Sequence, residues 1–271
     1  MSKENKRELA KTLGVSRSSL YYAPKKPQKD WQLKCAMEEV LRVHPSYGHR
    51  RLAIALGMNK KRTKRAMKLF GIQPYRRRGK KWRKPPCRPE NIVGNLLMGT
   101  VPLHPNHIWA TDCTHVDWKN KRLFIATMMD LHTRTVTGFS VLTNHSVHLA
   151  INSLFSGIHK HPAPEILHSD RGSEYTGKDM RIILELLGTK QSMSRAGCPW
   201  ENGYQESFYS QFKVDLGNPS RFSSLGELVY EIYRLIHSYN TDRIHTALRM
   251  PPEAFALRYQ TSQFLASCNV S

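Results

Sequence analysis

The sequence predicts an α/β protein in which a core domain, built on a mixed sheet, follows an all-helical N-terminal third. The first observation is the distribution of charge: residues 1–90 hold 26 lysines and arginines against six acidic residues, a net charge of +20, whereas residues 91–271 are nearly neutral at +1. The second is periodicity, because apolar residues recur at helical spacing in the first third and strand-like alternation begins only near residue 107. A basic third joined to a neutral remainder indicates a region that binds a polyanion, and nucleic acid fits better than a membrane because no basic stretch carries a broad aromatic or leucine face.

Composition also excludes several classes of protein. The chain has 271 residues, enough for one ordinary domain with smaller ones, and no apolar run reaches the roughly 18 residues of a membrane-spanning helix. Its N-terminus lacks the apolar segment of a secretory signal. The five cysteines are odd in number and form no Cys-x-x-Cys pair, so we expect reduced thiols in a cytoplasmic protein and no zinc site.

Residues 1–23 have the spacing of a short helix-turn-helix. Ala10 is small enough for two helices to approach, Gly14 can take the left-handed conformation that ends the first helix, and Ser16 can cap the second. The second helix would then offer Arg17 to a DNA groove. A helical hairpin with a glycine cap gives the same pattern, and it is the surrounding positive charge that favours DNA binding.

Residues 30–73 are a second helix-turn-helix candidate, after a linker expected over 24–30. An amphipathic helix is expected over 31–43, followed by two helices separated by Gly57. A solvated face explains a single lysine or arginine, but the six cations without an acid over 59–68 favour contact with phosphates. The expected DNA contacts of this module are Arg50, Arg51, Lys60, Lys61, Arg62, Lys64 and Arg65.

A basic linker is expected over 74–103. Proline and dense positive charge argue against a packed element there, so we expect this segment to lie along a nucleic-acid backbone. Its expected DNA contacts are Arg76, Arg77 and Arg78.

The core domain is expected over 104–262, including a C-terminal helical tail. Three strands come first, and their short connections favour an antiparallel arrangement, after which helix, strand, helix, strand and helix follow in order. The expected strands are 107–118, 123–131, 135–142, 165–168 and 190–193, and the expected helices are 146–158, 178–187 and 200–216. This order is the layout of a ribonuclease-H-like fold, with a mixed five-stranded sheet and helices packed on it.

Three carboxylates on three separate elements indicate a metal site that works on nucleic acid. Asp112 lies inside the first strand on the same face as Ile108, which is unfavourable unless the side chain is exposed or used in chemistry. Asp170 follows the fourth strand, and 35 residues separate it from Glu206 on the last core helix. If the three meet at one edge of the sheet, they supply the oxygen ligands that Mg²⁺ prefers, and two such ions about 3.5–4 Å apart catalyse phosphodiester displacement.

Other acidic residues compete for these roles. Asp117 faces the other way on a regular strand, and Glu174 closely follows the second candidate ligand. Glu201 and Glu206 differ by about 140° around a helix, so only one of them can face the site, and the spacing leaves the choice open. Lys213 lies on the same face as Glu206 and is a candidate phosphate contact, although a solvated lysine is the better explanation for this residue taken alone.

Several stretches of the chain together carry a family pattern. They are Tyr47-Gly48-His49-Arg50-Arg51, Trp109-Ala-Thr-Asp112-Cys-Thr114, His168-Ser-Asp170-Arg-Gly172-Ser-Glu-Tyr175, Gly197-Cys-Pro199-Trp-Glu-Asn202-Gly-Tyr-Gln-Glu206-Ser-Phe208, and Tyr239-Asn-Thr-Asp-Arg243-Ile-His245-Thr-Ala-Leu248 followed by Pro251-Pro-Glu-Ala-Phe255. Over residues 30 to 258 the chain resembles the second-reading-frame transposases of the insertion sequence 3 family, whose core is similar to retroviral integrase. One departure is Arg249-Met250, where the family usually has glycine and an aromatic residue.

The resemblance implies a DDE transposase in which Asp112, Asp170 and Glu206, rather than Glu201, bind two Mg²⁺ ions, with Mn²⁺ as a substitute. It also implies that Lys213 contacts DNA. Cleavage at the terminal inverted repeats of the element would free a 3′-OH, which then attacks a second phosphodiester. The implied partners are terminal-repeat and target DNA, further copies of the chain, and a first-reading-frame protein joined by frameshifting, all at the bacterial nucleoid.

Two other functions fit the same residues. One is a ribonuclease-H-like nuclease that cleaves without joining strands. The other is a DNA-binding regulator with an inactive core, which requires at least one of the three carboxylates to be dispensable.

Overall fold

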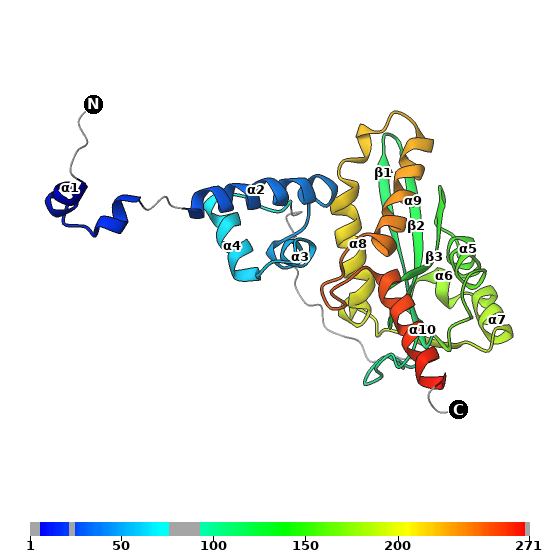
Figure 1. Cartoon of the computed structure of the whole chain (residues 1–271). Coiled ribbons are helices and arrows are strands. Elements are labelled where there is room, and N and C mark those ends of the chain that lie inside the picture. The colour runs from blue at the N-terminus through cyan, green and yellow to red at the C-terminus, as the bar shows by residue number, and fades with distance from the viewer. Residues whose placement is uncertain (1–5, 22–24, 76–92, 269–271) are drawn as a thin grey trace.

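The computed structural model describes residues 6–21, 25–75 and 93–268 (Figure 1). Two short N-terminal elements lead to a three-helix module, and the sheet-containing core follows. The helical third comprises α1 (Lys6–Thr12), the 3-10 helix η1 (Arg17–Tyr21), α2 (Lys25–Val43), α3 (His49–Ala55) and α4 (Lys60–Leu69). The core comprises β1 (Ile108–Trp118), β2 (Lys121–Asp130), β3 (Val136–Leu142), α5 (Val147–Ile158), β4 (Ile166–Ser169), α6 (Ser173–Thr176), α7 (Lys178–Leu186), β5 (Lys190–Met193), η2 (Pro199–Asn202), α8 (Gly203–Leu216), η3 (Pro219–Arg221), α9 (Leu225–Thr241) and α10 (Pro252–Cys268).

Two expectations for the N-terminal third are wrong in detail. The second element of the first hairpin is a 3-10 helix instead of an α-helix. Helix α2 begins at Lys25, so nearly all of the linker expected over 24–30 is helical. Pro27 lies in the first turn, where its missing N–H breaks no helical hydrogen bond. Asp30 is buried and pairs with Arg65 of α4, which gives this segment a tertiary contact that composition does not reveal.

The three-helix module has its own apolar core and is attached to the sheet-containing core. Leu33, Met37, Tyr47, Leu52, Ala66 and Met67 form that core, and Ile244 from the tail packs against it. Tyr47 Oη accepts a hydrogen bond of 2.8 Å from the backbone N–H of Ile244. Asp215 near the end of α8 accepts hydrogen bonds from Ser46 and from Arg243. The last turn of α8 is therefore fixed to the module.

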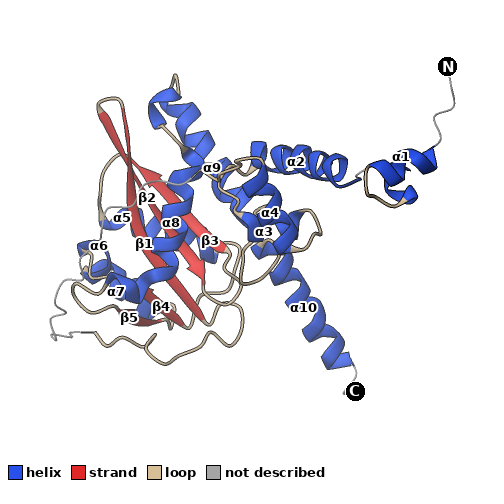
Figure 2. Cartoon of the chain, turned by 90° about the vertical axis from the view of Figure 1, so that its left-hand side faces the viewer, coloured by secondary structure: helices blue, strands red, loops and turns tan. Residues whose placement is uncertain are grey.

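The sheet has five strands in the order β3-β2-β1-β4-β5. The pairs β1–β2 and β2–β3 are antiparallel, whereas β1–β4 and β4–β5 are parallel. Helices α8 and α9 cover the face of the sheet toward the module, and α5, α6 and α7 cover the opposite face (Figures 1 and 2). The mixed sheet between two helical layers confirms the ribonuclease-H-like prediction.

Alternation along β1 decides which helical layer each of its side chains meets. Val116 and Trp118 pack in the cluster that includes α8 and α9, and Trp109 packs in the cluster that includes α5 and α7. Because successive side chains point to opposite faces, Asp112 lies on the α8 side and Cys113 on the α5 side. The predicted alternation of β1 is therefore present.

Strand β3 and helix α5 meet backbone to backbone. A Cβ atom added to Gly138 would lie 2.3 Å from the carbonyl oxygen of Ser153 and 2.4 Å from the nitrogen of Gly157. Both are main-chain atoms that cannot rotate away, so only glycine allows α5 to approach the sheet this closely.

Two further expectations concern cysteines and membranes. Cys35 and Cys113 are free thiols, but Cys198 is disulfide-bonded, so the prediction of reduced thiols throughout is wrong for Cys198. Scattered single cysteines carry no spacing signal, because bonding depends on proximity in the fold. Within the described ranges, no helix is long and apolar enough to cross a membrane.

We predict that Gly138→Ala lowers the free energy of unfolding by about 3 kcal/mol, because the added methyl group collides with main-chain atoms of α5. Thermal or urea unfolding measures the change. The matched control is Gly226→Ala in the exposed first turn of α9, where the added Cβ meets only ordinary contact at 3.8 Å. Equal stability of the two variants would contradict this account of the β3–α5 contact.

Candidate active site

Three buried side chains at the start of α8 bind the main chain of β1. Asn202 Nδ2 donates to the carbonyl oxygen of Thr111 at 2.9 Å, and Gln205 Nε2 donates to that of Ala110 at 2.6 Å. Tyr209 Oη donates to the carbonyl oxygen of Asp112 at 2.7 Å. On its β4 side, β1 pairs only from Ile108 to Ala110, so these side chains attach α8 where strand pairing ends.

Asp112 lies on β1 in a group of carboxylates. Its Oδ1 accepts a hydrogen bond of 2.8 Å from the backbone N–H of Cys113. Burial first, and then the negative charges of Asp170, Glu206 and Glu174, raise the pKa of Asp112 to about 7. Four acidic side chains therefore share one neighbourhood, as expected for a site that a cation would stabilise.

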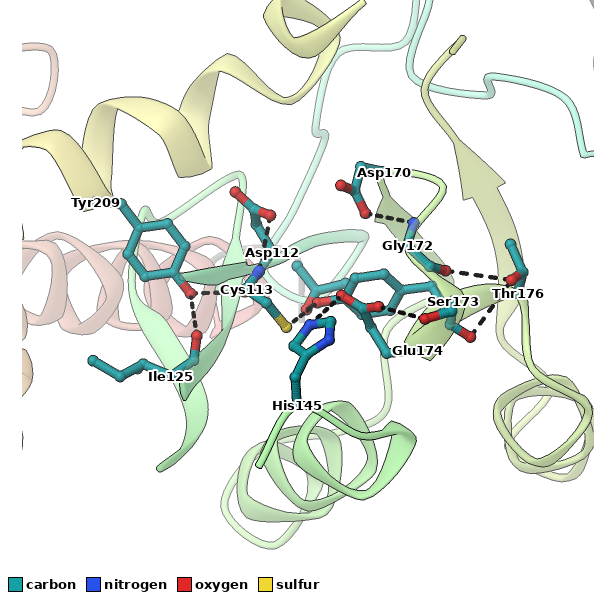
Figure 3. Close-up of polar contacts among 12 residues, drawn as sticks. Asp112, Cys113, Ile125, His145, Asp170, Gly172, Ser173, Glu174, Thr176 and Tyr209 are labelled. Carbon is teal, nitrogen blue, oxygen red and sulfur yellow. Dashed lines mark hydrogen bonds and ion pairs between the residues drawn. The ribbon is translucent and has the colours of Figure 1, made fainter. Parts of the chain in front are cut away.

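Asp170 directly follows β4. Its Oδ1 accepts a hydrogen bond of 2.9 Å from the backbone N–H of Gly172, which fixes the carboxylate at the strand end (Figure 3). Although part of the side chain reaches solvent, partial burial and then the charge of Glu174 raise its pKa. A Cβ atom on Gly172 would lie 2.6 Å from the Glu174 carboxylate, so a larger residue at this position would displace the Glu174 side chain.

The structure separates the roles of the two competing glutamates. Glu201 precedes α8 in η2 and is held by Arg195, with Oε1 2.7 Å from Nε, and by Asn95, whose Nδ2 donates to Oε2 at 2.7 Å. Hydrogen bonds from Arg195 and Asn95 lower the pKa of Glu201 despite its partial burial. Glu206 is exposed in the first turn of α8, and its charge acts on Asp112.

A thiol, an imidazole and a carboxylate meet on the opposite side of β1, and sequence reasoning did not bring them together. The Sγ of Cys113, a nitrogen of His145 and a carboxylate oxygen of Glu174 all lie within 4.8 Å of one another (Figure 3). His145 Nε2 is 3.2 Å from Glu174 Oε1. Tyr175 Oη lies 3.2 Å from the Cys113 sulfur. No spacing in the sequence connects these residues, because they come from three distant elements.

The residues expected to contact DNA occupy different surroundings. On α4 the expected cations are all exposed, although Arg65 pairs with Asp30. Arg17 and Arg50 are exposed, whereas Arg51 is half-buried and its Nη1 lies 3.4 Å from Gln211 Oε1. Lys213 lines a hollow of about 310 Å³ beside His115 and Asp117. The expected contacts Arg76, Arg77 and Arg78 lie outside the described residues.

Comparison with known proteins gives a consistent result. Two family models described as Integrase core domain match residues 102–199 and 187–252. The transposase for insertion sequence element IS904 of Lactococcus lactis subsp. lactis (strain IL1403) is 31% identical over 202 residues, which cover 70% of this chain and 77% of that protein. The insertion element IS600 uncharacterized 31 kDa protein of Shigella sonnei is 31% identical over 269 residues, covering 93% of this chain and 98% of that protein.

Among solved structures, a chain of the simian T-cell lymphotropic virus intasome in complex with PP2A regulatory subunit B56 gamma has a TM-score of 0.51. It is 17% identical, and the match covers 78% of this chain and 70% of that one. At 17% identity, this similarity is evidence for a shared fold and for nothing further.

The raised pKa of Asp112 predicts a specific pH dependence of stability. In the folded protein Asp112 keeps its proton up to about pH 7, whereas an ordinary aspartate loses it near pH 3.8. The free energy of unfolding of the metal-free protein therefore falls as pH rises between these two values. Asp112→Asn should therefore be more stable than the wild-type protein in EDTA, by an amount that grows by about 2 kcal/mol between pH 5 and pH 8.

Thermal unfolding at the two pH values measures this difference. The control is Asp117→Asn on the same strand, since a hydrogen bond from Arg122 lowers the pKa of Asp117 and its removal should bring no gain. An Asp112→Asn variant that is less stable than wild type at pH 8 would contradict the account.

Proposed function

The chain belongs to the second-reading-frame transposases of the insertion sequence 3 family, and we propose that Asp112, Asp170 and Glu206 carry out its DNA cleavage and joining. The protein is a DNA transposase with a DDE-type polynucleotidyl transferase core. The observation that carries the residue assignment is the raised pKa of Asp112, because it reflects burial together with the charges of Asp170 and Glu206. Glu201 is already paired with Arg195 and accepts a hydrogen bond from Asn95, which favours Glu206 as the third carboxylate.

Integrase-like DDE enzymes depend on divalent metal, and we propose two Mg²⁺ ions, with Mn²⁺ as a substitute. The donor set fits, since hard divalent cations prefer carboxylate oxygens and would relieve the mutual repulsion around Asp112. When bound, such ions supply the Lewis acidity that phosphodiester displacement requires at the attacking and leaving oxygens.

The protein's own contribution is to hold these carboxylates in place. The N–H groups of Cys113 and Gly172 fix Asp112 and Asp170, and the bonds from α8 to β1 fix the turn that carries Glu206. In the first reaction water attacks a phosphodiester at the terminal inverted repeat, a P–O bond forms, and the 3′-oxygen leaves and takes a proton. In the second, that 3′-OH attacks another phosphodiester, and a different 3′-oxygen leaves. Neither reaction requires a covalent bond to the protein.

The basic third is proposed to hold the terminal repeats. Within it, α4 presents its cations to solvent, and Arg50 of α3 is exposed beside it. Lys213 on α8 is proposed to hold a phosphate near the carboxylates, with Arg17, Arg51 and Arg76 to Arg78 as further DNA contacts. We propose domain boundaries at 1–23, 30–73, 74–103 and 104–262, although residues 93–103 already contact the core through Leu96 and Leu97.

The proposed assembly contains several copies of this chain on the two element ends. A first-reading-frame protein, joined by frameshifting, would add DNA recognition. The proposed location is the cytoplasm, at the bacterial nucleoid.

A joining assay tests the residue assignment. We expect the full chain with Mg²⁺ to cleave a labelled duplex carrying the terminal repeat of its own element and to produce joined strands. Asp170→Asn should lower joining at least about a thousand-fold, or about 4 kcal/mol of transition-state stabilisation. The control is Asp179→Asn, an exposed carboxylate in the first turn of α7.

Each other outcome of this assay has a definite meaning. Joining that survives in Asp170→Asn shows that the site assignment is wrong. Cleavage without joining by the wild-type chain supports a nuclease. Binding without chemistry under any divalent metal supports a DNA-binding regulator.

A second prediction concerns the cations of α4. The double variant Lys61→Gln and Lys64→Gln should weaken DNA binding and lower the slope of log Kd against log salt by about two, because each lysine releases roughly one counterion. Fluorescence anisotropy over a salt series measures the slope. The control is Lys178→Gln with Lys190→Gln, two exposed lysines of the core, and an equal change in both double variants would show that α4 has no special role.

A further inference from the structure

A small cavity lies where the helical module, α8 and the tail meet. It has a volume of about 80 Å³, and its charged lining consists of Arg51 from α3, Arg134 from the β2–β3 turn and Arg243 from the residues after α9. His245 also lines it, so the Arg243-Ile-His245 part of the tail motif contributes two of its walls. None of the described residues that line this cavity is acidic.

Polar atoms on this lining lack hydrogen-bond partners. Among the described residues, eight buried side-chain nitrogen and oxygen atoms are without a partner. Three of the eight, Arg51 Nε, Arg134 Nη1 and His245 Nδ1, belong to this one cavity. Because an unpaired buried polar atom costs free energy, three at one place indicate a ligand that accepts hydrogen bonds.

The charges around the cavity are only partly balanced. Asp215 pairs with Arg243, and the Arg134 guanidinium lies over the Tyr204 ring, 4.0 Å from its centroid. Burial first, and then the positive charges of Arg134, Arg51 and Arg243, lower the pKa of His245 to about 4. The ligand that suits these surroundings is therefore an anion.

We propose that this cavity binds one phosphate group. Guanidinium groups bind phosphate oxygens through paired, charge-assisted hydrogen bonds, and three of them converge here. The volume exceeds the roughly 10–15 Å³ that a single water needs, which leaves room for a tetrahedral oxyanion. Exposed Tyr204 and Ser207 line its rim on α8, and Ser207 directly follows Glu206.

Two sources can supply the phosphate. One is a backbone phosphate of DNA that also passes the carboxylates, and this source rests on the proposed transposase function. The other is a free phosphate anion. Phosphate binding itself requires neither metal nor catalysis, so it can be tested independently of the proposed function.

Arg134→Asn is the most informative variant. Arg134 has a positive φ of 66°, a conformation that asparagine adopts more readily than arginine. The variant removes one of three neighbouring positive charges without straining the backbone, so the ligand-free protein should unfold at the same or a higher temperature. Arg134→Lys serves as a second variant that keeps the charge and loses the planar fork. The control is Arg258→Gln, an exposed arginine on α10.

The first experiment is thermal unfolding of the full chain in EDTA with increasing inorganic phosphate, at constant ionic strength maintained with chloride. We expect a saturable rise of Tm in the wild-type protein and in Arg258→Gln. In Arg134→Asn the apparent affinity for phosphate should fall at least about tenfold, with Arg134→Lys in between. An equal phosphate response in the wild-type and Arg134→Asn proteins, or no saturable response in the wild type, overturns the proposal.

The second experiment distinguishes the two sources by binding a terminal-repeat duplex in EDTA. Weaker DNA binding by Arg134→Asn, together with competition by inorganic phosphate, supports a DNA backbone phosphate as the ligand. Unchanged DNA binding together with a lost phosphate response supports a free phosphate anion. Failure of the joining assay with intact phosphate binding would reject the proposed function and leave this site in place.

Discussion

The attachment of α8 to β1 is the interaction on which the site depends. Asn202, Gln205 and Tyr209 hydrogen-bond carbonyl oxygens of three consecutive residues of β1, at the point where that strand loses β4 as a neighbour. The positions of main-chain carbonyl groups in a strand do not depend on side-chain conformation. Hydrogen bonds to three of them therefore fix the position of α8 relative to the sheet. A carboxylate on the first turn of α8 is thereby held close enough to one on β1 for its charge to raise that group's pKa.

Much of this arrangement can be predicted from the sequence, because it depends on the two-residue alternation of side chains along a strand and on the order of the elements. The alternation along β1 and the element order gave the five-stranded sheet, and the separate elements of Asp112, Asp170 and Glu206 suggested convergence. Long-range contacts have no such signal. The spacing of residues in the sequence does not predict that Glu201 pairs with Arg195 or that Asp30 pairs with Arg65 of α4. It also does not predict that Glu174 lies beside Cys113.

Helix α8 separates two surroundings of opposite charge. On one side the charges of Asp170, Glu206 and Glu174 contribute to the raised pKa of Asp112. On the other, beside Ser207, three arginines line a cavity that has no acid among its described lining residues. Both arrangements cost stability in the ligand-free protein, and the proposed ligands, a divalent cation and a phosphate group, would relieve them. The stability that these like charges cost the ligand-free protein would be recovered when the ligands bind.

The connection of the module to the tail has an evolutionary consequence. Ser46 and Tyr47 precede the basic helices, yet their partners Asp215, Arg243 and Ile244 lie some 170 to 200 residues later in the chain. A chimera that takes its N-terminal module from one relative and its core from another would join two unmatched surfaces, unless the tail is exchanged as well. Exchange of the N-terminal module between relatives therefore keeps these contacts only when the segments around Asp215 and Arg243 are exchanged with it.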